Sequence, residues 1–424
     1  MKTKILFFGI AFCLTFSVFG QEKKARRIVE VLCSDSLYGR GYVDNGVNKA
    51  AYFLRDEFKK AGLQTFLDDD SYLQPFTHPV NTFPGIMSMS VDGEQLIPGE
   101  DFLVDPVAGS FDGKLEMIEI DTTVLSDLDK LNPTVAEVRS GEKNTFYINL
   151  VGMSGHDTYV ATQKLQGLAM VGTVVFVTNQ KLTWSVSDRQ LEFPLMHVKP
   201  NKIDPSAAIE IHIDAKRISD FESNNVIGYL PSEKKRAKTI VFSAHYDHLG
   251  GMGTTPKTYF PGGNDNASGT AMLISMADYF RTHPSDYNIV FIAFAGEEAG
   301  LLCSKYFVEQ KTMKLKEIEF LLNLDIMGSG EEGITVVNGR QLTEEFKTLT
   351  DINDKNEYLS KVKPRGETAN SDHYFFYKNG VPCFFIYTMG PNKHYHDVYD
   401  TYEELSFAAY DDIVMLLIDF VGEF

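Results

Sequence analysis

The sequence predicts an α/β protein in which a mostly parallel sheet is flanked by helices and a smaller β-rich domain is inserted into the chain. Three features predict it. The strand segments of the C-terminal half are almost wholly apolar, helical segments separate them, and the middle of the chain carries short alternating segments instead. Apolar strands that alternate with helices are typical of parallel sheets covered on both faces.

The first twenty residues have the pattern of a cleaved export signal. Lys2 and Lys4 precede an apolar run at residues 5–14, and Val18 and Gly20 are small enough for a cleavage site near Gly20. A membrane anchor is the alternative, but the run is too short to span a bilayer. We therefore expect an exported protein, periplasmic or secreted, with no stable membrane span.

The bulk composition argues against one class of partner and one class of chemistry. A formal net charge of −18 makes nucleic acid an unfavourable partner. Cys33, Cys303 and Cys383 remain after cleavage of the signal, and all three lie in apolar stretches. We expect buried free thiols and no nucleophilic cysteine.

The chain up to residue 222 is expected to supply helices and then the inserted domain. Residues 24–62 show the helical spacing of apolar side chains, with a break at residues 34–36. A helix is expected at residues 160–168, and short alternating strands at residues 88–91, 115–120, 174–177 and 209–213. We assign residues 21–86 and 223–424 to one domain and residues 87–222 to the insertion.

The C-terminal half is expected to form the parallel sheet. The pattern predicts apolar strands at residues 239–244, 288–294, 320–324 and 381–387, and helices at residues 268–280 and 299–309. A polar or Gly-rich loop follows each strand. Because ligands of such sheets bind outside the carboxyl ends of the strands, we expect a site there.

Metal-binding side chains stand at these strand ends. The candidate ligands are His245, Asp265, Glu298, Asp325 and His396, and Glu297 is a further carboxylate beside them. Two imidazoles and three carboxylates suit a pair of divalent cations, and an unliganded glutamate suits a general base. The sequence therefore predicts metal-assisted hydrolysis.

The carboxylates also have competing interpretations. Asp265 stands just before a predicted helix, where an N-cap is common, but beside the other candidates it suits a bridge between two metals. Glu297 and Glu298 would repel each other unless a cation is close, although an acidic helix start is the alternative. Asp325 ends an apolar run, where a carboxylate is costly unless it is paired or coordinated.

Each candidate histidine has an aspartate that suits a supporting role. Asp247, two residues after His245, is expected to bind the metal or to orient the second ring nitrogen of that histidine. Asp400 follows His396 and is expected to support it in the same way. His248 is expected not to be a ligand.

These motifs together resemble the M28 family of zinc aminopeptidases, which implies a zinc-exopeptidase-like fold. The matching segments are His245-Tyr246-Asp247, the loop at residues 263–269, Gly296-Glu297-Glu298, Asp325, Ser371-Asp372-His373, and His396 with Asp400-Thr401. The resemblance covers residues 225–424 and, less strongly, the helices within residues 24–85. The insertion resembles, more weakly, the protease-associated domain.

The resemblance implies an aminopeptidase that binds two Zn²⁺ per chain, with Asp265 bridging the ions. Glu298 and His396 would complete one zinc site, and His245 and Asp325 would complete the other. The substrates would be peptides with a free N-terminus.

The resemblance also implies the course of the reaction. A metal-bridging hydroxide would attack the first carbonyl of the peptide, with Glu297 as general base. Asp372 and His373 would support the pocket. The oxyanion would be held by one of three tyrosines, namely Tyr374, Tyr387 or Tyr395.

Two other functions fit part of the pattern. A glutaminyl-cyclase-like enzyme resembles the same fold and keeps similar carboxylates, but it uses a single zinc ion. A non-catalytic binding relative would have lost ligands, and no ligand position is lost here. The sequence leaves open the preferred first residue of the substrate, the oligomeric state and the role of the insertion.

Overall fold

A computed structural model describes residues 21–67 and 71–424. The predicted export signal lies outside the described residues, so it stays a prediction. Within the described ranges, no helix combines the length and the apolar character needed to cross a membrane.

A nine-stranded mixed sheet forms the centre of the molecule, in the order β1-β12-β16-β13-β17-β20-β18-β19, with β2 also paired to β12. Its strands are β1 (Gln64–Thr65), β2 (Leu73–Thr82), β12 (Lys216–Leu230), β13 (Thr239–His245), β16 (Asn288–Phe294), β17 (Ile318–Leu324), β18 (Ile334–Val337), β19 (Val362–Pro364) and β20 (Cys383–Thr388). The four neighbours β16, β13, β17 and β20 run parallel. The predicted α/β class is confirmed: the sheet is mixed, with parallel strands at its centre and antiparallel pairs on either side of them.

Continuous burial explains why these four strands are apolar along their whole length. Every residue of β13 is buried, and Phe242 of this strand stacks on Phe291 of β16 with ring centroids 5.7 Å apart. Burial of a phenylalanine side chain stabilises a fold by about 1.5–3 kcal/mol. Many polar residues stand at the strand ends, where the chain leaves the sheet, and Ser243 and Asn323 are buried polar residues within β13 and β17.

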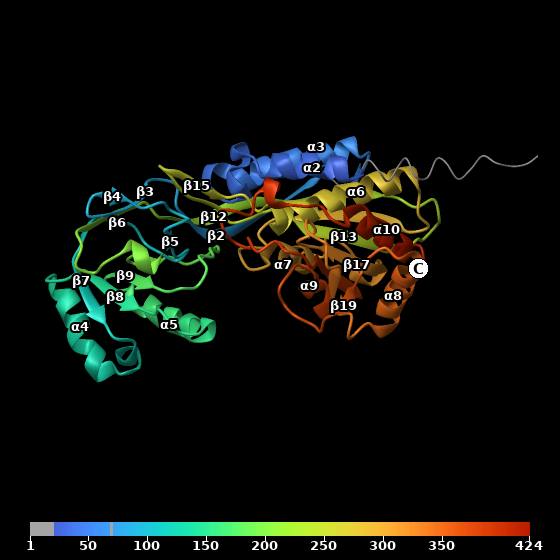
Figure 1. Cartoon of the computed structure of the whole chain (residues 1–424). Coiled ribbons are helices and arrows are strands. Elements are labelled where there is room, and N and C mark those ends of the chain that lie inside the picture. Colours follow the sequence, from blue (N-terminus) through green and yellow to red (C-terminus); the bar gives the residue numbers. More distant parts are fainter. Residues whose placement is uncertain (1–20, 68–70) are drawn as a thin grey trace, which may run out of the picture.

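Helices cover both faces of the sheet (Figure 1). Helices α2 (Gln21–Leu32), α3 (Gly46–Lys60) and α6 (Gly269–Thr282) lie on one face, and α7 (Leu302–Glu309) and α9 (His373–Lys378) lie on the other. Two further helices, α8 (Thr343–Asn356) and α10 (Tyr410–Val421), pack together near the C-terminus. Cys33, Cys303 and Cys383 are buried free thiols, as expected.

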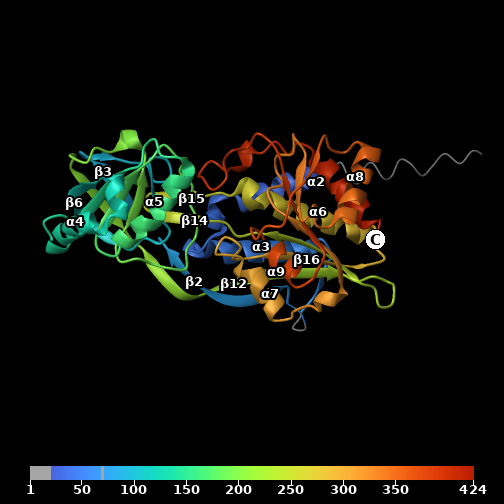
Figure 2. The same cartoon turned by 90° about the horizontal axis from the view of Figure 1, so that it is seen from below.

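Residues 87–213 form two further sheets to one side of the main sheet (Figures 1 and 2). A five-stranded sheet contains β5 (Phe102–Val104), β7 (Met117–Ile120), β8 (Thr145–Asn149), β9 (Thr173–Val177) and β10 (Leu195–Val198). A four-stranded sheet contains β3 (Met87–Val91), β4 (Glu94–Gln95), β6 (Phe111–Leu115) and β11 (Ile209–Ile213). Helices α4 (Leu128–Ser140) and α5 (Gly155–Leu168) complete this part, and only α5 was expected.

A long ribbon of β2 and β12 connects this part to the main sheet. The sequence did not predict β2, because Pro75 and Pro79 interrupt its pattern. Proline is compatible with a strand at a sheet edge, and among the described strands β2 pairs only with β12.

The core of the middle region also includes residues from the C-terminal half. Leu249, Met252 and Phe260 pack in one apolar cluster with Phe83 and Trp184. The first three flank or belong to the hairpin of β14 (Gly250–Thr254) and β15 (Lys257–Phe260). The middle region is therefore packed directly against the chain segment that leads to residue 265.

The stacked pair at the centre of the sheet gives a test of this packing. We expect Phe242→Ala to lower the free energy of unfolding by about 3–5 kcal/mol, because it leaves a cavity between β13 and β16. Tyr159→Ala is the control, since 63% of the Tyr159 side chain is exposed. Denaturant unfolding measures both, and equal stability of the two variants would contradict the packing described.

Candidate metal centre

Asp265 lies between the two candidate histidines. Its Oδ1 atom is 3.2 Å from Nε2 of His245, and its Oδ2 atom is 3.1 Å from Nε2 of His396. The side chain is 5% exposed, so neither oxygen is a surface group. One carboxylate thus presents a different oxygen to each imidazole.

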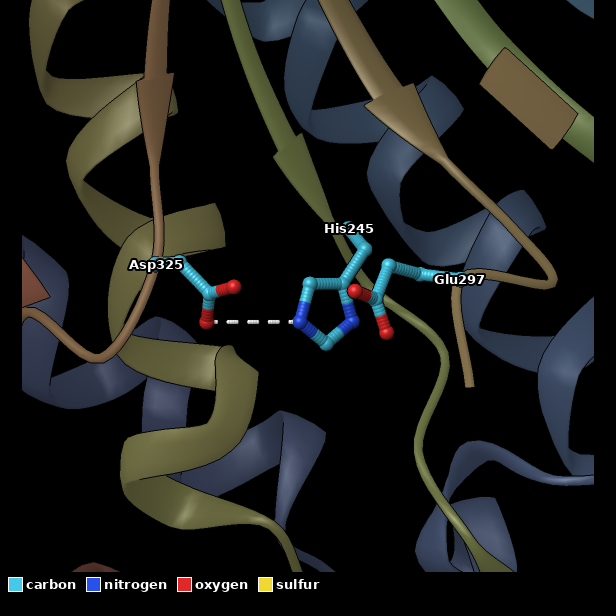
Figure 3. A group of neighbouring side chains, drawn as sticks. All are labelled: His245, Glu297 and Asp325. Carbon is cyan, nitrogen blue, oxygen red and sulfur yellow. Dashed lines mark hydrogen bonds and ion pairs between the residues drawn. The ribbon is translucent and has the colours of Figure 1, made fainter. Parts of the chain in front are cut away.

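The other candidate ligands complete two groups around Asp265. Asp325 Oδ1 is 3.3 Å from Nε2 of His245, and Glu298 Oε2 is 3.4 Å from Nε2 of His396. A dashed line marks the contact between Asp325 and His245 in Figure 3. Tetrahedral ligands with bonds of 2.0–2.1 Å to zinc are about 3.3 Å apart. The donor atoms therefore have the separation and the chemistry that suit a pair of zinc ions.

The candidate ligands shift one another's pKa values. Burial alone would raise the pKa of Asp265, but His245 and His396 lower that pKa well below its usual value. Burial alone would lower the pKa of His396, yet Glu298 and Asp265 raise it to about 11. The pKa of Glu298 falls to about 2, because His396 and His248 outweigh the effect of burial. Carboxylates and imidazoles hold one another in place here by charge.

Glu297 differs from its neighbour. Burial and the nearby carboxylates of Glu298, Asp372 and Asp325 raise its pKa well above the usual value, although His245 opposes them. Figure 3 shows the Glu297 carboxylate beside the His245 ring, on the side away from Asp325. A carboxyl group with a raised pKa next to a ligand cluster suits a proton acceptor.

The end of β16 places both glutamates. Gly296 has φ 74°, a conformation that favours glycine, and it turns the chain so that the next two amides face Asp247. Asp247 Oδ1 accepts from the Glu297 amide at 3.2 Å, and Oδ2 accepts from the Glu298 amide at 3.4 Å. The carboxylate of Asp247 therefore fixes the two glutamates.

The expected partnership between Asp247 and His245 has a different form. Nδ1 of His245 lies 3.2 Å from the backbone oxygen of Asp247 and 3.7 Å from its carboxylate. The backbone carbonyl is thus the nearer partner of the imidazole. The Asp247 carboxylate instead accepts hydrogen bonds from the Glu297 and Glu298 amides at the end of β16.

Asp400 supports the site through Asp265 and does not pair with His396 as expected. Its carboxylate accepts from the amide of Asn264 at 2.9 Å and from the amide of Asp265 at 3.0 Å. Nδ1 of His396 instead contacts the backbone oxygen of Trp184 at 2.9 Å. This partner is a backbone carbonyl 212 residues away, which no sequence pattern marks.

The loop that carries His396 is fastened by the middle region of the chain. The Trp184 amide donates to the His396 backbone oxygen at 2.9 Å, which complements the contact to the ring. Lys181 donates to the backbone oxygens of Lys393 and Tyr395 and pairs with Asp397 at 2.8 Å. The His396 loop is therefore attached to residues 181–184 by several contacts.

Arg40 holds the Asp265 loop in place. It was not among the residues predicted from the sequence. It is fully buried and donates to the backbone oxygens of Tyr246, Pro261 and Gly262 at 2.7, 2.5 and 2.7 Å. It also donates to the Leu32 oxygen at 2.9 Å. One guanidinium thus joins the end of β13 to the loop that leads to Asp265.

A chain of buried hydrogen bonds orients Asp325. Ser243 donates to Asn323 at 2.7 Å, Asn323 donates to Ser371 at 2.8 Å, and Ser371 donates to Oδ2 of Asp325 at 3.1 Å. Oδ1 is then left to face His245. Two parallel strands, β13 and β17, and the turn before α9 are coupled in this way.

The remaining predicted residues lie around the cluster. Asp372 is buried, accepts from Cys303 at 3.4 Å, and has its pKa raised to about 7 by burial, with Asp247 adding to the increase. His373 is buried against Phe385, with ring centroids 5.1 Å apart. His248 contacts Glu298 Oε1 at 2.8 Å, so it adjoins the cluster, and its exclusion as a ligand stays a prediction.

A cavity of about 290 Å³ opens beside the cluster. It is lined by His245, Asp265, Glu297, Glu298, Asp325, Ile326, Arg365, Asn370, Phe385, Tyr387, Tyr395 and His396. All six candidate ligand and base residues therefore reach one open space. Of the three tyrosines considered, Tyr387 and Tyr395 line the cavity and Tyr374 does not.

Comparison with known proteins agrees with this site. Residues 225–421 match the model of Peptidase family M28, so the predicted resemblance to that family is confirmed for this part of the chain. Aminopeptidase YwaD of Bacillus subtilis (strain 168) is 29% identical over 275 residues, which cover 59% of this chain and 57% of YwaD. A probable leucine aminopeptidase of Trichophyton verrucosum (strain HKI 0517) is 25% identical over 58% of this chain and 64% of its own length. The matches thus span less than two thirds of each relative.

Solved structures share the fold over nearly the whole chain. BSAP, a zinc aminopeptidase from Bacillus subtilis, superposes with a TM-score of 0.69 and 20% identity, covering 93% of this chain and 94% of BSAP. An aminopeptidase from Aneurinibacillus sp. strain AM-1 gives a TM-score of 0.61 at 20% identity, covering 94% of this chain and 92% of that protein. The zinc-exopeptidase-like architecture is therefore confirmed.

The contacts of Lys181 generate a test that does not depend on activity. We expect Lys181→Met to weaken zinc binding by roughly tenfold, because outer residues that hold a ligand in place commonly affect metal affinity by 10–100-fold. Competition with a zinc chelator measures the affinity.

Lys199→Met is the matched control. Lys199 is an exposed lysine, and together with Lys181 it lines a second cavity that is separate from the cavity beside the metal cluster. Equal zinc affinities for the two variants and the unaltered protein would show that the His396 loop does not need this support.

Proposed function

We propose that this chain is an exported dizinc aminopeptidase that removes N-terminal residues from peptides. One observation carries the proposal: the two oxygens of Asp265 face two different histidines, and each histidine has a second carboxylate beside it. This arrangement suits a bridging ligand between two ions. The names of the relatives, which are zinc enzymes or aminopeptidases, agree with a metallo-exopeptidase.

The proposed ligands divide into two sets that share Asp265. His245 and Asp325 would hold one zinc ion, and Glu298 and His396 would hold the other. When bound, the two ions would lower the pKa of a water molecule and polarise the scissile carbonyl. Nitrogen and oxygen donors of this kind are usual for catalytic zinc.

Glu297 is the proposed general base. It adjoins His245 and lines the cavity, yet it is not needed to complete either set of ligands. Its carboxylate would take the proton of the attacking water and return it to the leaving amine. Asp247 fixes the backbone of Glu297 and so keeps this carboxylate at the end of β16.

Tyr395 is the proposed donor to the oxyanion. It precedes His396, its ring stacks on the His396 ring at 3.8 Å, and it lines the cavity. The hydroxyl of Tyr387 is instead engaged by Arg365 at 3.0 Å. Asp372 and His373 would support the pocket wall from behind, through Cys303 and Phe385.

We also propose that residues 87–222 form an inserted domain, with residues 21–86 and 223–424 forming the peptidase domain. The separate sheets of residues 87–213 support this division. Lys181 and Trp184 of the insertion contact the His396 loop. The proposed role of the insertion is therefore to hold this metal ligand in place.

The role of Glu297 can be separated from metal binding. We expect Glu297→Gln to lower kcat on aminoacyl-anilides by about 10²–10⁴-fold, the usual contribution of a general base, while the zinc content stays unchanged. Steady-state kinetics and elemental analysis of the same samples measure both quantities.

Glu309→Gln serves as the control, because Glu309 is an exposed glutamate at the end of α7. Zinc-loaded protein that cleaves no substrate of a broad panel, or a Glu297→Gln variant as active as the unaltered protein, would refute the proposed function.

A further inference from the structure

The cavity beside the metal cluster contains one strongly basic side chain. Of the described residues that line it, Arg365 is the only lysine or arginine, and the same lining includes four carboxylates. The proposed mechanism gives Arg365 no task.

The backbone holds Arg365 firmly at this place. Arg365 follows β19, its amide donates to the Val336 oxygen at 2.8 Å, and its own oxygen accepts from the Arg340 amide at 3.3 Å. The residue is therefore attached to the edge of the main sheet through β18. Its side chain starts from a fixed point on the cavity wall.

The side chain is also oriented. Nη1 of Arg365 donates to the Tyr387 hydroxyl at 3.0 Å, and the guanidinium carbon is 5.9 Å from the centroid of that ring. Tyr387 itself belongs to β20 and lines the same cavity. A guanidinium has five N–H donors, so this bond leaves others for a ligand.

Arg365 has no acidic partner in the described part of the chain. The ion pairs that the described residues form within 4.0 Å include many surface lysines and arginines, but not Arg365. The residue is exposed to the cavity and its charge is not neutralised by a neighbouring carboxylate. A planar guanidinium of this kind matches a carboxylate with two parallel hydrogen bonds.

We propose that Arg365 binds a carboxylate of the peptide substrate and so sets a preference for acidic substrates. The carboxylate comes either from an aspartate or glutamate side chain at the first residue or from the C-terminus of a short peptide. A cationic first residue is disfavoured by the same charge. This inference rests on the proposed function, because it names the substrate class of that site.

The two sources of the carboxylate are distinguished by four substrates. Glutamyl- and leucyl-p-nitroanilide lack a C-terminal carboxylate and differ in the side chain. The dipeptide Leu-Gly and its amide Leu-Gly-NH₂ share their side chains and differ in the C-terminus. The zinc-loaded full chain and its Arg365→Gln variant are assayed on all four.

We expect Arg365→Gln to lower kcat/KM by about 10–100-fold for one carboxylate-bearing substrate and by less than about threefold for its uncharged partner, since hydrogen bonds to charged groups are worth roughly that factor. A loss confined to glutamyl-anilide assigns the contact to the side chain. A loss confined to Leu-Gly assigns it to the C-terminus. Arg365→Lys should restore part of the loss, because it restores the charge.

Arg340→Gln is the matched control. Arg340 is an exposed arginine joined to Arg365 by a backbone hydrogen bond, but it does not line the cavity. Equal losses on all four substrates, no loss on any, or the same losses in Arg340→Gln overturn the inference while leaving an active aminopeptidase. Zinc-loaded protein inert on all four substrates and on the broad panel overturns the proposed function, and this inference with it.

Discussion

The carboxylate of Asp265 between two imidazoles is the contact on which the site depends. Its oxygens lie 3.2 and 3.1 Å from nitrogens of His245 and His396, in surroundings almost closed to solvent. The carboxylates of Asp265, Glu297, Glu298 and Asp325 gather around one cavity, and such groups repel one another unless positive charge is supplied. The ends of β13, β16 and β17 and two loops bring these groups together, and bound cations would relieve the repulsion.

Fixed backbone contacts keep these charges together. Arg40 ties the chain before Asp265 to the end of β13, and Asp400 accepts the Asp265 amide. Asp247 holds both glutamate amides, and residues 181–184 hold the His396 loop. Asp265, Glu298 and His396 are thus positioned by partners that are remote in sequence. The middle region contacts the candidate metal centre without contributing a candidate ligand to it.

The sequence predicted the strands and the position of the site because both depend on local pattern. Apolar runs mark β13, β16, β17 and β20, and parallel strands bring their carboxyl ends to one edge. The contacts that hold the candidate ligands in place were not predictable from the sequence. The roles of Arg40 and Trp184 rest on backbone carbonyls, which no side-chain pattern marks, and Asp400 was paired with its neighbour in sequence when its true partners are amides near residue 265. Strand β2 was not predicted because its two prolines interrupt the strand pattern, although proline is compatible with an edge strand.

The most direct test is a crystal structure of the zinc-loaded protein with data collected at the zinc absorption edge. We expect two anomalous peaks, separated by about 3.5–4 Å, with one Asp265 oxygen on each ion. His245 and His396 would then coordinate different ions. A single peak, or two ions that both lack Asp265 as a ligand, would contradict this expectation.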